Sequence, residues 1–196
     1  IGLREGDVIT IEKALISTIV RSANDAAVVL AEAISGSEYE FAEKMTRKAK
    51  ELGMSRTTFR NASGLPDEEQ RTTAKDMAQL AIALLRDYPQ YYHYFKTPSF
   101  TWKGVAYKTH NRVNQNYAGA DGLKTGYIRA SGFNLVTSAV RNGTRLVGVV
   151  MGGPTAAVRD ARMIALLDRS FGKDGVGNNV YASSQVSPVI NEYEIG

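Results

Sequence analysis

Two short runs of residues carry side chains that can support acyl-transfer chemistry. Lys124, Thr125 and Gly126 set a cation, a hydroxyl and an unsubstituted backbone position side by side, and Ser22 lies two residues before Asn24. A lysine can stabilise charge on a reacting carbonyl, a threonine hydroxyl can bind a carboxylate, and a glycine lets a ligand lie against the strand without a Cβ clash. Lys-Thr-Gly arises by chance in only about one such chain in twenty. The run therefore indicates a substrate-binding strand.

Ser22 and Asn24 have a structural interpretation beside the chemical one. Ser, Asn and Asp are preferred caps of helices, so the pair can simply mark a helix junction. If both side chains project from that junction into a cleft, the hydroxyl can relay a proton and the amide can hold a lysine or a substrate carbonyl. The presence of Lys124-Thr125-Gly126 in the same chain favours the chemical interpretation.

Arg159 is a third candidate, because it follows Gly152-Gly153-Pro154 at the start of the last expected helix. An arginine fork can bind a terminal carboxylate through two parallel hydrogen bonds. The structural alternative is a solvated arginine at a helix end. Sequence spacing alone does not bring Arg159 near Thr125.

The sequence also contains one Ser-x-x-Lys run, Ser170-Phe171-Gly172-Lys173. A nucleophilic serine and its lysine base need to lie one helical turn apart on one face. Here Gly172 lies between them at an expected helix end, and the run follows Lys-Thr-Gly where a nucleophile motif would precede Ser-x-Asn. We therefore do not assign Ser170 as a nucleophile.

The composition bounds the kinds of site this chain can hold. Its 196 residues are 43% hydrophobic, which is enough to bury a core, and no apolar run approaches the length of a membrane span. Cys is absent, and His93 and His110 are not at a metal-ligand spacing. We expect no thiolate nucleophile, no zinc site, no cofactor and no Ser-His-Asp triad.

The net charge of +4 allows two interpretations. The ordinary one is a modestly basic surface. The alternative is attraction to an anionic polymer or a peripheral association with a membrane face. No block of Lys and Arg indicates nucleic-acid binding.

Helical patterns fill the first part of the chain. Capping residues and apolar periodicity define their ends. The expected helices are 11–21 after Thr10, a second that starts at the Ser22–Asp25 break and runs through Ala26–Ile34 to Gly36, a third opened by the capping box Ser37–Glu40 and running to Leu52 before Gly53, and a fourth over Met77–Arg86 opened by Thr73–Asp76. A polar loop is expected over Asn61–Gln70.

Strand patterns follow from Ser99 onward. The expected elements are a hairpin of Phe100–Trp102 and Val105–Tyr107, a loop over Asn111–Gly122, a strand over Asp121–Tyr127 with a turn at Asp121-Gly122, a hairpin of Phe133–Arg141 and Arg145–Met151 with a type I′ turn at Asn142-Gly143, and a closing helix over Ala156–Phe171. Helices first, then an antiparallel sheet, indicate the α+β class. We expect a catalytic domain over 1–172 and a tail, or the start of a further segment, over 173–196.

Several runs occur together in a recognisable order. They are Arg21–Ala27, Leu52–Met54 with Thr57–Phe59, Ala62–Leu65, Thr73–Ala78, Asp121–Gly126, Gly132–Val136 and Val149–Gly152. In these runs the chain, from about Gly2 to Phe171, resembles the low-molecular-weight penicillin-binding proteins that act as serine D-Ala-D-Ala carboxypeptidases. The resemblance implies a penicillin-binding/β-lactamase-like transpeptidase fold with a helical cluster packed on an antiparallel sheet, here incomplete at the N-terminus.

The resemblance also implies a function. It implies an exported bacterial enzyme, in the periplasm or at the outer face of the cytoplasmic membrane, that removes the terminal D-Ala of peptidoglycan stem peptides and is acylated by β-lactams. Ser22 would pass a proton to the leaving amine, Asn24 would orient a lysine and the substrate amide, and Lys124 would stabilise charge. Thr125 and Arg159 would hold the terminal carboxylate, and the Tyr127 N–H would form half of an oxyanion hole.

The chain departs from the family pattern in three ways. The Ser-x-x-Lys nucleophile motif is missing before Ser22, so we expect it in an N-terminal segment of the same protein, and the fragment alone should be inactive. Tyr127 follows Lys-Thr-Gly where relatives often have Thr or His. Only about 25 residues follow Phe171, so we expect the β-rich C-terminal domain of many relatives to be absent or truncated.

Two other functions remain as alternatives. A class A-like β-lactamase shares the motif order but needs a deacylating glutamate, and the loop with Glu68 and Glu69 lacks the Glu-x-x-Leu-Asn setting. A non-catalytic murein-binding module would keep the cleft without the nucleophile.

Overall fold

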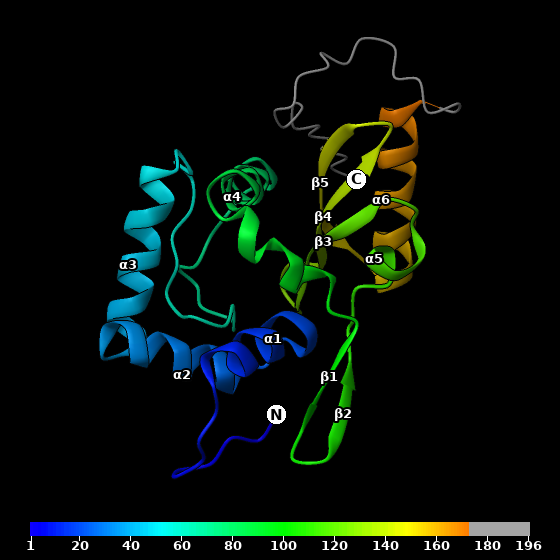
Figure 1. Cartoon of the computed structure of the whole chain (residues 1–196). Helices are drawn as coiled ribbons and strands as arrows, with labels where there is room; N and C mark the ends of the chain where they lie inside the picture. The colour runs from blue at the N-terminus through cyan, green and yellow to red at the C-terminus, as the bar shows by residue number, and fades with distance from the viewer. Residues whose placement is uncertain (173–196) are drawn as a thin grey trace.

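The computed structural model describes residues 1–172, and the expected tail over 173–196 lies outside the described residues. Four helices come first, and strands and a last long helix follow (Figure 1). In chain order the elements are α1 (Ile11–Arg21), α2 (Asn24–Ser35), α3 (Glu38–Glu51), α4 (Ala74–Asp87), the 3₁₀ helix η1 (Pro89–Lys96), β1 (Ser99–Trp102), β2 (Val105–Lys108), α5 (Arg112–Asn116), β3 (Ala120–Ile128), β4 (Gly132–Arg141), β5 (Thr144–Gly153) and α6 (Ala156–Phe171). The α+β class is confirmed.

The strands form two antiparallel sheets. β1 pairs with β2, and β3, β4 and β5 pair in that order. Asn142 and Gly143 join β4 to β5 with φ of 48° and 76°, as a type I′ turn requires. The predicted hairpin around Asn142-Gly143 is thus confirmed, and the β1–β2 hairpin also lies where the sequence predicts it.

The three-stranded sheet lies between two helices, which pack on opposite faces (Figure 1). On one face Leu135 and Ala139 of β4 pack against Met163 and Leu167 of α6. On the other face Val147 and Val149 of β5 and Leu123 of β3 pack with Ala78 and Ala81 of α4. Burial of these apolar side chains on both faces fixes β3 relative to the helical cluster.

Side-chain caps place the helix starts where the sequence predicts them. Thr10, Ser37, Thr73 and Thr155 each accept a hydrogen bond from a backbone N–H in the first turn of α1, α3, α4 and α6. Each cap satisfies a donor that the helix itself leaves unpaired. These helix positions are therefore confirmed, with α4 beginning at Ala74 instead of Met77.

The helix caps at the α1–α2 junction are not those expected from Ser22 and Asn24. Ser22 ends α1 in the left-handed region, with φ of 56°. The N-cap of α2 is Ala23, which makes no side-chain cap, and Asn24 is already the first helical residue. Neither polar side chain caps the start of α2, so that part of the structural interpretation is wrong. The pair does mark the helix junction, because Ser22 is the C-cap of α1.

Two further expectations are corrected. The predicted loop over Asn111–Gly122 contains the short helix α5, and β3 begins inside it at Ala120. Asp121-Gly122 is not a turn: it lies within β3, where the register with β4 shifts between Ala120 and Gly122. The sequence also did not predict η1, whose aromatic residues follow Pro89 without a helical period.

Candidate active site

Ser22 and Lys124 meet although they lie 102 residues apart. The Lys124 Nζ donates a hydrogen bond to the Ser22 Oγ, and a second one to the Thr125 carbonyl oxygen at 2.8 Å. The left-handed backbone at Ser22 ends α1 where β3 passes. The structure thus joins the two motifs that the sequence singled out.

Lys124 is a cation without a carboxylate partner among the described residues. Burial and, after it, the positive charge of Arg159 lower the pKa of Lys124 from its ordinary value to about 8. Both effects disfavour the charged ammonium. An anion that entered beside Lys124 would relieve the repulsion, so the environment favours an anionic ligand.

Arg159 lies close enough to influence Lys124, and its side chain is buried at 4% exposure. Its Nε and Nη2 donate to Asp160 Oδ1 at 2.9 and 2.7 Å, and its Nη1 donates to the Asn134 carbonyl oxygen at 3.2 Å. The solvated-arginine alternative is therefore wrong. Asp160 offsets part of the charge that Arg159 could offer a ligand.

The close approach of α6 to the sheet needs a glycine at 153. A Cβ on Gly153 would lie 2.8 Å from the Arg159 Cβ, which is closer than real Cβ contacts. Asn134 links the segments beside this contact. Its Oδ1 accepts a hydrogen bond from Gly152 N at 3.0 Å, and its Nδ2 donates one to Ser131 Oγ at 2.9 Å. The sequence analysis did not identify Asn134 as a site residue.

The rest of the predicted strand is open to a ligand. Gly126 and Tyr127 are exposed and Thr125 is half-buried. A Cβ on Gly126 would make only an ordinary contact of 3.8 Å with Asn134, so packing within residues 1–172 does not demand glycine there. The Tyr127 ring lies 4.3 Å from the Phe133 ring, centroid to centroid. The predicted oxyanion role of the Tyr127 N–H stays a prediction.

Asn24 lies near the pair but does not join it. Its side chain is exposed in the first turn of α2 and makes no hydrogen bond with the described residues. The predicted contact with a lysine stays a prediction.

Two residues that the sequence analysis did not assign to the site flank Ser22 and Lys124. Arg21 Nη1 lies 2.6 Å from His110 Nε2, and the Arg21 Cζ lies 5.8 Å from the centre of the Tyr107 ring. Burial and the positive charges of Arg21 and Lys124 lower the pKa of His110 below its ordinary value. His110 therefore lies in the same positive region as Lys124.

The start of β3 is held by an ion pair between the buried Asp121 and the partly exposed Arg145. Arg145 Nη1 on β5 donates to Asp121 at 2.8 Å from Oδ2 and 2.9 Å from Oδ1, and also to Ser138 Oγ at 2.5 Å. The Tyr92 hydroxyl donates to Asp121 Oδ1 at a longer 3.4 Å. This network anchors the strand three residues before Lys124.

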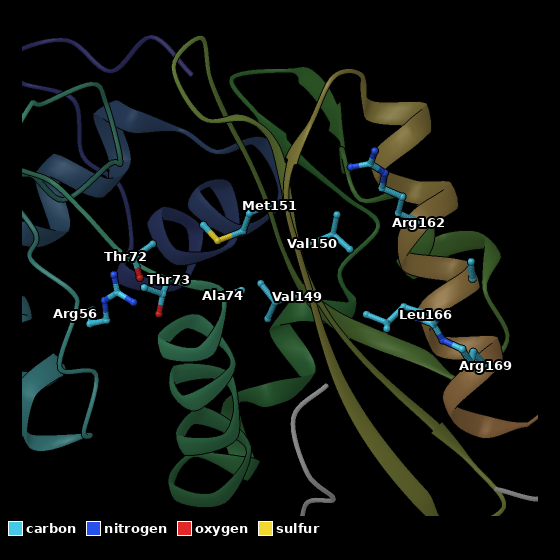
Figure 2. A pocket seen from close by; sticks show the side chains of 11 residues that line it. Arg56, Thr72, Thr73, Ala74, Val149, Val150, Met151, Arg162, Leu166 and Arg169 are labelled. Atoms are coloured by element: carbon cyan, nitrogen blue, oxygen red, sulfur yellow. The ribbon is translucent and has the colours of Figure 1, made fainter. Parts of the chain in front are cut away.

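A cavity of about 450 Å³ lies away from these residues. Figure 2 shows its lining on both sides of β5, with Arg56 and Thr72 beside the start of α4 and with Arg162 and Leu166 on α6. It follows the outer edge of β5, which pairs with no other strand within residues 1–172. No predicted site residue lines it.

Other kinds of site are not seen in the described part of the chain. Residues 1–172 contain no group of three or more His, Asp or Glu that could hold a metal ion. Within the same range no helix has the length and apolarity to cross a membrane. Ser170 donates to the Leu166 carbonyl oxygen at 2.8 Å, and at 1.5 Å per residue it lies about 16 Å along α6 from Arg159.

Comparisons with known proteins extend these findings. The D-alanyl-D-alanine carboxypeptidase family (peptidase family S11) matches residues 1–155. The carboxypeptidase DacD of Escherichia coli is 37% identical over 166 residues, which cover 84% of this chain and 43% of DacD.

Solved structures share the fold. Penicillin-binding protein 5 of Haemophilus influenzae superposes with a TM-score of 0.83 at 34% identity, over 86% of this chain and 50% of that one. Penicillin-binding protein D2 of Listeria monocytogenes in its ampicillin-bound form gives a TM-score of 0.73 at 29% identity, over 84% of this chain and 74% of that one. The predicted penicillin-binding fold is confirmed.

The chain spans less than half the length of DacD. Within that span the match includes both motifs and most of the described residues. The chain therefore belongs to the D-alanyl-D-alanine carboxypeptidase family.

Proposed function

We propose that this chain is part of a serine D-Ala-D-Ala carboxypeptidase that trims the terminal D-Ala from peptidoglycan stem peptides. The contact between Lys124 Nζ and Ser22 Oγ carries the proposal. It brings a proton-relaying hydroxyl and a carboxylate-binding strand to one place, as hydrolysis of a peptide with a free C-terminus requires. The names of the similar proteins support the same substrate class.

The reaction forms and then breaks an acyl-enzyme. A serine hydroxyl oxygen attacks the carbonyl carbon of the penultimate D-Ala, and the lysine of its Ser-x-x-Lys motif takes the hydroxyl proton. Ser22 passes a proton to the amine that leaves, and the terminal D-Ala departs with it. Water then attacks the ester, which frees the serine and the shortened peptide.

The hydrogen bonds of Ser22 suit its part in this reaction. Lys124 donates to the Ser22 oxygen, so the proton of Ser22 itself is directed elsewhere and can be given to a leaving amine. A lysine ammonium has three donors, and two are used within the described residues. The third is available to a substrate. Thr125 and Arg159 bind the terminal carboxylate, Asn24 orients the substrate amide, and the Tyr127 N–H contributes to the oxyanion hole.

The nucleophile comes from a segment of the same protein that precedes Ile1. Within the printed sequence only Ser170 begins a Ser-x-x-Lys run, and it lies far along α6. The chain spans 43% of DacD, which is consistent with a further catalytic segment. On this proposal residues 1–172 form part of the catalytic domain, and alone they are inactive.

The carboxypeptidase is favoured over a β-lactamase by the loop before α4. Glu69 is exposed and paired with Arg60 at 2.8 Å, and Glu68 is also exposed. Neither glutamate makes a hydrogen bond with Ser22 or Lys124 in the described part of the chain. We propose that β-lactams form long-lived adducts here; the ampicillin-bound form of a relative supports the binding of β-lactams. A murein-acting enzyme works outside the cytoplasm, so we propose export to the periplasm or the outer face of the membrane.

Mass analysis of the protein with its upstream segment restored tests the proposal. After incubation with penicillin, peptide mapping should find one adduct on the serine of an upstream Ser-x-x-Lys, and a D-Ala-D-Ala peptide should release D-Ala. Rapid penicillin turnover would instead indicate a β-lactamase. A folded protein with neither adduct nor D-Ala release would indicate the murein-binding module.

A further inference from the structure

Arg21 occupies the position next to Ser22, at the end of α1. Its Nη1 donates to His110 Nε2, since a guanidinium cannot accept, and the His110 ring therefore carries its proton on Nδ1. The Tyr107 ring lies under the same guanidinium. Two contacts from the hairpin side thus hold an exposed side chain in a defined place.

The charge of Arg21 is not neutralised by these contacts. Within residues 1–172 Arg21 has no carboxylate partner, whereas Arg145 and Arg159 are paired with Asp121 and Asp160. An imidazole and an aromatic ring orient a guanidinium but leave its net charge in place. A fixed and uncompensated cation beside a reaction centre is suited to a ligand carboxylate.

We propose that Arg21, held by His110, forms a subsite that selects an acidic side chain on the terminal residue, which is released when the acyl-enzyme forms. The proposal rests on the proposed function, in which Ser22 gives its proton to the leaving amine. Arg21 is then a specificity-determining residue, and His110 is a positioning residue that acts through it.

The connectivity of the site places this subsite on the leaving side. Ser22 follows Arg21 directly in the sequence, and its hydroxyl accepts a hydrogen bond from Lys124. His110 contacts Arg21 and lies within electrostatic reach of Lys124. If the amine of the terminal residue meets Ser22 and its α-carboxylate meets Thr125 and Arg159, the Arg21 guanidinium beside His110 is the cation left for its side chain.

Two peptides that differ only in one charge test the inference. One ends in D-Ala-D-Glu and the other in D-Ala-D-Gln, and both are given to the protein with its upstream segment restored. We expect kcat/KM to favour D-Glu about five- to tenfold, as a preformed arginine–carboxylate contact allows. A ratio near one in the wild type would overturn the proposal.

Variants assign the preference to Arg21. Arg21→Gln should bring the ratio close to one, Arg21→Lys should keep part of it, and His110→Phe should lower it by freeing the guanidinium. Arg47→Gln is the matched control, because Arg47 is an exposed arginine on α3 that lies near Glu43. A full preference retained in Arg21→Gln would overturn the proposal.

Binding of the free amino acids separates this inference from the proposed function. D-Glutamate should shift the His110 ring resonances in NMR spectra saturably, D-glutamine should not, and Arg21→Gln should abolish the shift. If no peptide is hydrolysed, the proposed function fails and this measurement alone decides the subsite. Equal responses to both amino acids would then overturn it.

Discussion

Two charged residues on β3, Asp121 near its start and Lys124 at its middle, have opposite surroundings. At the start, Asp121 is buried and paired with Arg145, which also binds Ser138. Three residues on, Lys124 is placed among hydroxyl and carbonyl oxygens, close to Arg159, with no carboxylate partner within the described residues. One strand thus contains a satisfied ion pair and an unsatisfied cation.

This difference separates stability from function along a single strand. Removing one member of a buried pair leaves an uncompensated charge and costs stability. A half-buried cation without a carboxylate partner already carries part of that cost. Such a residue is typical of a site where a ligand supplies the missing charge. Asp121 therefore fixes the strand, and on the proposed function Lys124 is left for the substrate.

The largest expected effect comes from Lys124→Ala. Loss of a preorganised donor at developing charge should lower kcat/KM for D-Ala release about 10²- to 10³-fold. The free energy of unfolding should change little, because the variant removes a half-buried charge that has no carboxylate partner within the described residues. Release of D-Ala and denaturant unfolding measure the two quantities, with the exposed Lys48→Ala as control. A large loss of stability without loss of activity would show that Lys124 supports the fold and not the reaction.

Asp121→Asn should act on stability. It leaves Arg145 without its carboxylate, and because Arg145 is partly exposed we expect a loss of about 2–3 kcal/mol in the free energy of unfolding, below the range for fully buried pairs. Asp87→Asn, which breaks the exposed pair with Arg86, should cost much less, because water screens exposed ion pairs. Equal losses in the two variants would show that the Asp121–Arg145 pair does not hold β3 in place.

The same contrast explains what the sequence could and could not predict. Local signals such as the Thr10 and Ser37 caps and the Asn142-Gly143 turn placed helices and a hairpin correctly, because the deciding interactions span only a few residues. The short helix α5 lacks room for a period and was missed.

Pairs of residues that lie far apart in the sequence could not be predicted from its local patterns. Asp121 meets Arg145 across 24 residues, and Arg21 meets His110 across 89. The Ser22–Lys124 pair was anticipated only because motif order in a known family supplied the link. No spacing rule predicted that Arg159 would be buried beside Lys124.

On the proposed function, Arg159→Gln should raise KM for a D-Ala-D-Ala peptide about tenfold, because one partner of the terminal carboxylate is lost. The change in kcat should be smaller. Steady-state kinetics on the protein with its upstream segment restored measures both constants. An unchanged KM would remove Arg159 from carboxylate binding and leave it as a partner of Asp160 alone.

The smallest expected effect is a displacement of the pH profile of kcat/KM. It tests what lowers the pKa of Lys124. The pKa of Lys124 is lowered to about 8 by burial and by Arg159. The ammonium is therefore charged below that pH and loses its proton above it, so kcat/KM should fall as pH rises through about 8. In Arg159→Gln the repulsion is gone, the pKa of Lys124 rises, and the descending limb should move to higher pH whatever the absolute rate. Lys124→Arg should lose this limb, because a guanidinium stays charged throughout the range. A descending limb at the same pH in Arg159→Gln would mean that burial alone lowers the pKa of Lys124. The positive charge of Arg159 would then have no part in preparing Lys124 to bind an anionic substrate.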